Sequence, residues 1–226
     1  MATTDPLAPY QWLNASESQA GPLGVIFSVA FFRHLAPSEV VRRLSNSDDS
    51  GQESDFEQLN DRMAEFVGTS DGGDGGGHVA VFSAGEWSVA VEPFGWWMTD
   101  HKTLAELSRD CEVLAITRHD YAEHSLEYAI DGSIVTGHRL WYPHIRWGCD
   151  PDRLNNHMRE LGMWLDMTDD DSIFDPDEDE SDADAWEISF RTGVPRAFAL
   201  AAKITGVVFT AEMLDQPLFI GPVVRR

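Results

Sequence analysis

The dipeptide Asp131-Gly132 is the feature that most constrains how this chain of 226 residues can fold. It separates two segments, 125–130 and 133–138, that contain the β-branched and aromatic residues typical of strands. Asp-Gly favours a two-residue hairpin turn, because both residues tolerate the positive φ that such a turn requires. We therefore expect these segments to form an antiparallel pair, and antiparallel pairing to dominate the fold.

A two-residue turn also determines which side chains share a face of the hairpin. Counting outward from the turn, Tyr128 is opposite Val135, and this pair is expected in the core. Glu127, Thr136 and His138 are then expected together on the other face of the hairpin, which is mostly polar. The pattern therefore predicts one polar sheet face within reach of solvent.

Short segments with the composition of strands recur along the chain, and most are joined by connections of hairpin length. Besides the hairpin, these segments are 23–32, 78–83, 86–92, 112–118 and 186–190. Segments with helical spacing or helix-start residues are 37–44, 54–68, 102–109, 150–163, 198–204 and a last one from Thr210. We expect one α+β domain over residues 1–226, with a mainly antiparallel sheet of about six strands covered on one face by helices.

Two segments differ in composition from the rest of this domain. Residues 69–77 are rich in glycine, which loses the most backbone entropy on ordering, so a flexible loop is expected there. The segment 166–185 is acidic and is expected to be a disordered loop. Twelve acidic residues and no Lys or Arg lie in 166–187, so this stretch supplies about half of the net charge of −23. The rest of the chain is only moderately acidic.

The charge balance excludes some classes of function. With 16 Lys and Arg against 39 Asp and Glu, the chain repels phosphate backbones and anionic lipid surfaces. We expect no direct nucleic-acid binding and no membrane binding, whereas a basic protein partner remains open. The longest apolar run, 23–32, is too short to span a bilayer. Two cysteines and an N-terminus without the pattern of a leader predict a cytoplasmic location.

The sequence contains no motif that predicts a catalytic residue, a cofactor or a metal ion. Neither lysine follows a glycine, as a phosphate-binding loop requires. Asp175, Asp177 and Asp179 have the spacing that begins a calcium loop, but Glu180 and Trp186 replace the Gly and Glu that complete it. We treat the three aspartates instead as candidates for contacts with a basic partner.

A second candidate group follows the strand segment 86–92. Glu92 ends this segment on the face opposite to its apolar side chains, just before a turn that contains Gly95, Trp96 and Trp97. Tryptophan is enriched among the residues that anchor protein interfaces. Glu92, Trp96 and Trp97 are therefore further candidates for partner binding.

Five blocks of the sequence carry a resemblance to a known family. They are PSEVVRRL (37–44), WSVAVEPFGW (87–96), YAIDG (128–132), RWGCDPD (146–152) and TGV (205–207). Together they resemble an uncharacterised family of actinobacterial proteins, a domain of unknown function. The resemblance spans most of the chain and implies no established reaction, so it transfers no catalytic residue. The glycine run and the acidic segment are additions to the family pattern.

We predict a non-enzymatic protein-interaction module of the immunity or antitoxin kind, because actinobacterial proteins of that kind look similar in size and acidity. Its acidic surface would attract a basic partner, and the binding would weaken with salt. The alternative is a small-molecule-binding or accessory enzyme protein that uses the polar face of Glu127, Thr136 and His138 beside Glu92. A deep pocket at those residues would favour this alternative. A third hypothesis is an acidic DNA mimic.

Overall fold

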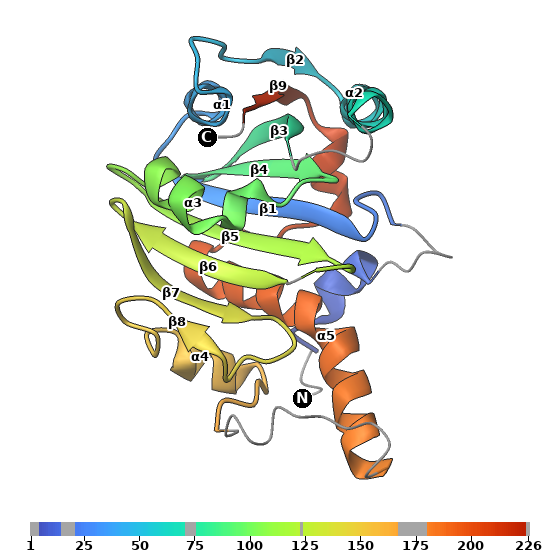
Figure 1. Cartoon of the computed structure of the whole chain (residues 1–226), viewed down its shortest axis with the longest axis vertical. Helices are drawn as coiled ribbons and strands as arrows, with labels where there is room; N and C mark the ends of the chain where they lie inside the picture. Colours follow the sequence, from blue (N-terminus) through green and yellow to red (C-terminus); the bar gives the residue numbers. More distant parts are fainter. Residues whose placement is uncertain (1–4, 15–20, 71–75, 123, 167–179, 225–226) are drawn as a thin grey trace.

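Within the residues that the structure describes, nine strands form one antiparallel sheet at the centre of the molecule (Figure 1). The computed structural model describes residues 5–14, 21–70, 76–122, 124–166 and 180–224, with side chains from residue 191 onward in the last range. The strands are β1 Ile26–Arg33, β2 Gln52–Ser54, β3 Gly77–Ala84, β4 Trp87–Pro93, β5 Glu112–His119, β6 Ser125–Ile130, β7 Ser133–Arg139, β8 Arg146–Trp147 and β9 Leu218–Val223. Their order across the sheet is β2-β9-β3-β4-β1-β5-β6-β7-β8.

The sheet is larger than the sequence predicts. The expectation of about six strands is wrong, because the described part of the chain already forms nine, whereas the α+β class is confirmed. β2 and β8 span only three and two residues, too few for an alternating pattern to be recognised. β9 contains Gly221 and Pro222, which argue against a strand in sequence-based reasoning. The segment 186–190, expected to be a strand, lies inside a helix.

Helices cover both faces of the sheet, not one as expected (Figure 1). They are η1 Ala8–Leu13, α1 Pro37–Ser45, α2 Phe56–Thr69, η2 Trp97–Thr99, α3 His101–Leu107, α4 Asn155–Glu160, α5 Glu180–Thr205 and η4 Ala211–Asp215. One core lies between the sheet and η1, α2, α4 and α5. The other core lies between the opposite face and α1, η2 and α3. In Figure 1, α3 lies in front of the sheet and α5 behind it.

Local signals account for the starts of the helices, with two corrections. Pro37 opens α1, as its fixed φ predicts. The spacing of Ser54 and Glu57 predicts a capping box with Ser54 as the N-cap of α2. The N-cap is instead Asp55, whose carboxylate accepts a hydrogen bond from a backbone N–H of the first turn. The stretch after Asp150 forms turns first, so α4 begins only at Asn155.

The segments 78–83 and 86–92 flank Ala84-Gly85, which predicts a two-residue turn there with Phe82 opposite Trp87. The structure instead pairs Phe82 with Val89 in the β3–β4 hairpin. Gly85 has a φ of +66°, so the two-residue turn begins there. Because the turn moves by one residue, each strand residue meets a partner two positions further along, and every side chain keeps its face.

Candidate functional site

The structure buries the candidate acid of β4 and leaves its two neighbouring tryptophans partly exposed. Glu92 has no exposed surface, whereas Trp96 and Trp97 are half-buried where the chain enters η2. The acidic segment that carries the other candidates, Asp175, Asp177 and Asp179, lies mostly outside the described residues, and so does most of the glycine-rich loop 69–77. From Glu180 onward the acidic segment forms the start of α5.

A row of polar side chains crosses the sheet on the face covered by η2 and α3. In register across five strands, it consists of Glu92, Ser28, Thr117, Ser125 and Arg139. Residues directly opposite each other in antiparallel strands point to the same side, so these side chains share one face. Most of the other buried side chains on this face are apolar. The row is therefore a polar line through a hydrophobic layer.

Hydroxyl groups join the middle of this row to η2. Thr99 donates to Thr117 at 2.8 Å, and the hydroxyls of Thr117 and Ser28 are 2.6 Å apart. Ser28 in turn donates to the backbone oxygen of Gly95 at 3.2 Å. Because buried hydroxyls are stable only when hydrogen-bonded, these contacts hold the segment with Trp96 against the sheet.

Glu92 occupies the closed end of the row. A Cβ at Gly95 would overlap its carboxyl group, so only glycine fits there. Neither carboxyl oxygen completes a hydrogen bond within the described residues. Burial raises the pKa of Glu92 to about 8, against the smaller opposite effect of the Trp97 backbone N–H. Glu92 is therefore protonated at neutral pH.

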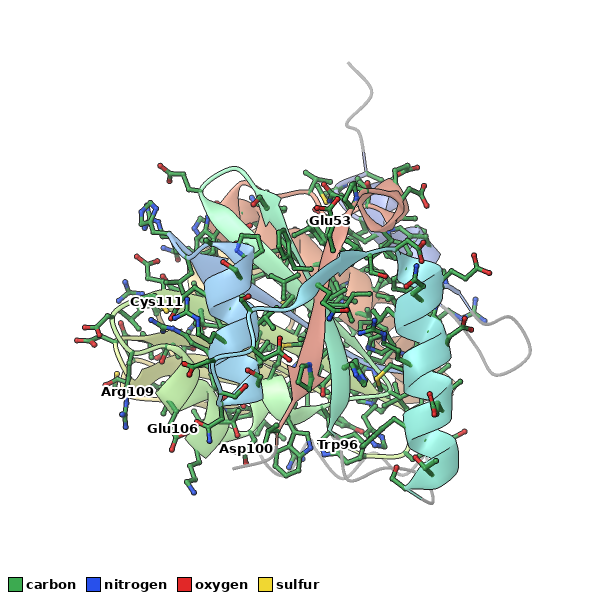
Figure 2. The ribbon with its side chains drawn as sticks, turned by 90° about the horizontal axis from the view of Figure 1, so that it is seen from above. Glu53, Trp96, Asp100, Glu106, Arg109 and Cys111 are labelled. Carbon is green, nitrogen blue, oxygen red and sulfur yellow. The ribbon has the colours of Figure 1, made fainter. Side chains whose placement is uncertain are left out.

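A cavity of about 790 Å³ lies over the other end of the row, next to η2 and the start of α3. Small-molecule sites typically have volumes of about 300–1,000 Å³. The cavity is lined by Trp96, Trp97, Thr99, Asp100, His101, Thr117, His119, Ala122, Ser125, Glu127, Arg139, Ile145 and Trp147. In Figure 2, Trp96 and Asp100 lie together at one side of the molecule, away from Glu53 in β2. The lining residues extend from Trp96 to Trp147, so the site is formed by residues that are far apart in the sequence.

Glu127 lies at the floor of the cavity and contacts His101 at its rim. The Glu127 side chain is 3% exposed and that of His101 is 61% exposed, and 3.1 Å separates Oε1 of Glu127 from Nε2 of His101. Burial raises the pKa of Glu127 to about 7, although His101 and the indole of Trp147 act in the opposite direction. Oε2 of Glu127 completes no hydrogen bond within the described residues. Both forms of this carboxyl group are therefore populated near neutral pH.

A β-bulge in the β6–β7 hairpin decides which residues of β7 face the cavity. The ladder shifts by one residue at Tyr128/Ala129, so Glu127 is opposite Gly137 and not Thr136 as expected. Thr136 and His138 consequently lie on the opposite face, and the predicted grouping of these two with Glu127 is wrong. The same shift brings Arg139 onto the cavity face. A one-residue slip changes the face of every later side chain, because the period of a strand is two.

The displaced residues have structural roles on the other face. Thr136 donates to the backbone oxygen of Pro151 at 2.9 Å. Burial lowers the pKa of His138 to about 3, and the positive charge of Arg146 adds to the effect. His138 is therefore neutral and buried, and it does not reach the cavity.

Gly137 allows the indole of Trp147 to lie against the sheet. A Cβ at Gly137 would be 2.5 Å from Nε1 of Trp147 and 2.7 Å from Cε2, closer than a real side chain can approach. The imidazole of His101 packs beside this indole, with 6.0 Å between the ring centroids. Trp96 and His119 form a similar pair across the cavity, at 4.9 Å in an edge-to-face arrangement. Aromatic rings thus form two walls of the site.

Four contributors to this site are not among the candidates from the sequence, namely His101, His119, Arg139 and Trp147. The sequence does contain a signal for Trp147, because this residue lies in the block 146–152 that carries the family resemblance. The others converge only through the fold. Among the described residues, no group of three or more His, Cys, Asp or Glu side chains is arranged to hold a metal ion.

No helix in the described part of the chain is long and apolar enough to cross a membrane. Comparison with known proteins gives one match, to a family model described as a family of unknown function, DUF6461, which covers residues 2–226. No curated protein matches the chain. No solved structure matches it either.

Proposed function

The chain belongs to DUF6461, a family of unknown function, and we propose that it binds a small organic molecule in the cavity beside η2 and α3. One observation carries this proposal. A cavity of about 790 Å³ is lined by a buried carboxyl group, that of Glu127 in β6. Binding sites for small molecules combine a concave, largely apolar surface with a few placed polar groups, and they often hold groups of perturbed pKa.

The lining favours a ligand that contains a flat ring. Trp96 and Trp147 offer indole surfaces, and aromatic side chains gain from stacking beyond the area they bury. Thr117, Ser125 and Glu127 provide hydrogen-bonding groups on the floor. A ring compound with polar substituents therefore matches both the walls and the floor.

Ligand-observed NMR with a library of small ring compounds tests the proposal. We expect binders whose affinity falls at least about tenfold in Trp147→Ala, because the wall against which the ring stacks is removed. Trp164→Ala is the matched control, since Trp164 is 53% exposed and does not line the cavity. A library without binders, or binders unaffected by Trp147→Ala, would contradict the proposal.

A protein partner at the same end of the molecule is the second candidate, and it retains the immunity or antitoxin hypothesis. Phe94 and Tyr121 are 45% and 68% exposed and lie within two residues of Trp96 and His119 of the cavity wall. Exposed aromatic residues of this kind are typical interface anchors. A basic partner should be retained from a source lysate at low salt and lost at high salt or in Phe94→Ser.

We also propose a cytoplasmic location and an actinobacterial source. Cys111 and Cys149 are both free thiols, which fits a reducing compartment. The strong preference for Arg over Lys among the basic residues fits a GC-rich genome. Fractionation of the source cells tests the location.

A further inference from the structure

Glu127 has the geometry of a group that exchanges protons with a bound molecule. It is 2% exposed, so it lies out of bulk water, yet it belongs to the lining of the cavity. One oxygen contacts His101, and the other completes no hydrogen bond within the described residues, although the nearby indole of Trp147 lowers the pKa of the carboxyl group. A buried acceptor that is incompletely paired can complete a hydrogen bond with a ligand group.

His101 connects this carboxyl group with solvent. Its Nε2 is 3.1 Å from Oε1 of Glu127, and 61% of its side chain is exposed at the rim. A proton on Glu127 can therefore pass to Nε2, while the imidazole releases its other proton, on Nδ1, to water. The pair thus has a buried inner group that lines the cavity and an exposed outer group at its rim.

The charged and titratable groups around the pair come from three elements. Asp100 lies beside His101 at the start of α3, and its carboxylate is held by the backbone N–H and the hydroxyl of Thr103. β5 contributes His119, and β7 contributes Arg139. Asp100 raises the pKa of Glu127, whereas His101 lowers it. Proton binding at Glu127 is therefore set by burial and by these neighbours together.

We propose that Glu127 is a general acid and base that transfers a proton to or from a flat, ring-bearing substrate held against Trp147, with His101 as its link to solvent. This inference rests on the proposed function, because the substrate occupies the same cavity. The substrate class is a carbon or oxygen acid within or next to an aromatic ring. A general base works best when its pKa is near the operating pH, and the pKa of Glu127 is about 7.

Nitrobenzisoxazole is a suitable probe of such a base, because it is flat and needs only one proton acceptor. The Glu127 carboxylate would take the proton on the ring carbon, and the electrons of that C–H bond would form the nitrile. The N–O bond breaks at the same time, and the oxygen leaves as a coloured phenolate. Glu127 then holds the proton and returns it to water through His101. No oxidant, reductant or second substrate is needed.

The experiment measures phenolate release by the full-length protein and, separately, probe binding by quenching of tryptophan fluorescence. We expect a rate at least about 100-fold above that of acetate at equal concentration. The rate should rise with pH through an apparent pKa of about 7, because only the ionised form of Glu127 accepts a proton. Glu127→Gln should lower the rate at least about tenfold and change probe binding less than about twofold.

Two variants separate this role from a structural one. His101→Gln keeps a polar group at the rim but removes the effect by which His101 lowers the pKa of Glu127, so the apparent pKa of the profile should rise while probe binding is retained. Glu53→Gln, on the exposed edge strand β2, should change neither the apparent pKa of the profile nor probe binding. Binding without phenolate release, or release that survives Glu127→Gln, overturns this inference and leaves the proposed function intact. Absence of quenching while other ring compounds bind excludes this substrate class.

Discussion

Two buried carboxyl groups lie on the same face of the same sheet, and their surroundings differ. Glu92 is fully buried beneath the turn that contains Gly95, whereas Glu127 is 2% exposed and faces a cavity. Burial raises the pKa of both groups, to about 8 and about 7. Only Glu127 contacts a second titratable side chain, His101. Burial is therefore the main cause of both raised pKa values, and the two groups differ because Glu127 reaches a cavity and a titratable neighbour.

The largest expected effect is on the pH dependence of stability, through Glu92→Gln. The unfolded carboxyl group ionises above its ordinary pKa of 4.5, but the folded one keeps its proton up to about pH 8. The unfolded state therefore binds fewer protons in this window, and the wild type loses stability as pH rises. Relative to wild type, the variant should gain about 4 kcal/mol between pH 5 and pH 8, measured by urea unfolding.

Glu53→Gln is the matched control for this comparison, because Glu53 is exposed in β2. Its free energy of unfolding should follow that of the wild type at every pH. Parallel curves for Glu92→Gln and the wild type would show that Glu92 ionises normally in the folded protein.

Gly95→Ala should lower the free energy of unfolding by about 2–3 kcal/mol. The new methyl group would overlap the carboxyl group of Glu92, which is fully buried. Thermal and urea unfolding measure the loss. In a Glu92→Ala background the cost should fall below about 1 kcal/mol, because the overlapping group is gone. An unchanged cost in that background would place the strain elsewhere.

Glu127→Gln should produce a smaller pH effect over a lower window. The folded pKa of Glu127 is about 7, so the wild type loses stability relative to the variant between about pH 4.5 and pH 7. We expect a relative gain of about 2 kcal/mol for the variant from pH 5 to pH 7, and little further change by pH 8. The plateau separates Glu127 from Glu92. A gain that continued to rise to pH 8 would mean that the two groups are equally enclosed.

The smallest expected effect on stability, about 1 kcal/mol, comes from Gly137→Ala, next to the indole of Trp147 at the cavity. Its Cβ would displace the indole of Trp147, which is only partly buried and can move. The affinity for a ring compound from the NMR screen should fall about tenfold. Gly68→Ala in α2 is the control, because a Cβ there meets nothing within 4 Å. Equal affinity in both variants would remove Trp147 from the ligand wall.

The sequence predicts the parts of this comparison that depend on local pattern. Alternation in the segment 86–92 places Glu92 opposite the apolar side chains of its strand, and the structure has it on that face. Asp131-Gly132 predicts the β6–β7 hairpin, whose first two pairs, including Ala129 with Ile134, have the expected register. The turn chemistry and the period of two are local properties, so no tertiary information is needed for them.

The remaining features depend on contacts that a single segment does not encode. The bulge at Tyr128/Ala129 leaves no recognisable sign in the sequence. Because of it, Arg139 lies on the cavity face, where His138 was expected. His101 reaches Glu127 only because α3 packs across β6 and β7. The two-residue strand β8, which carries Trp147, is defined by its pairing with Gly137. The sequence pattern therefore predicts only that Glu127 lies on a polar face of the sheet, and tertiary packing brings the other residues of the site to it.

The most direct test of the difference between Glu127 and Glu92 is a carboxyl-carbon NMR titration of protein labelled at glutamate, with each signal assigned by its Gln variant. Glu127 should titrate near pH 7 and shift when a ring compound binds, whereas Glu92 should titrate near pH 8 and stay unchanged. A Glu127 signal that titrates at the ordinary value of 4.5, or that ignores a bound ligand, would contradict the assignment of Glu127 to a functional site.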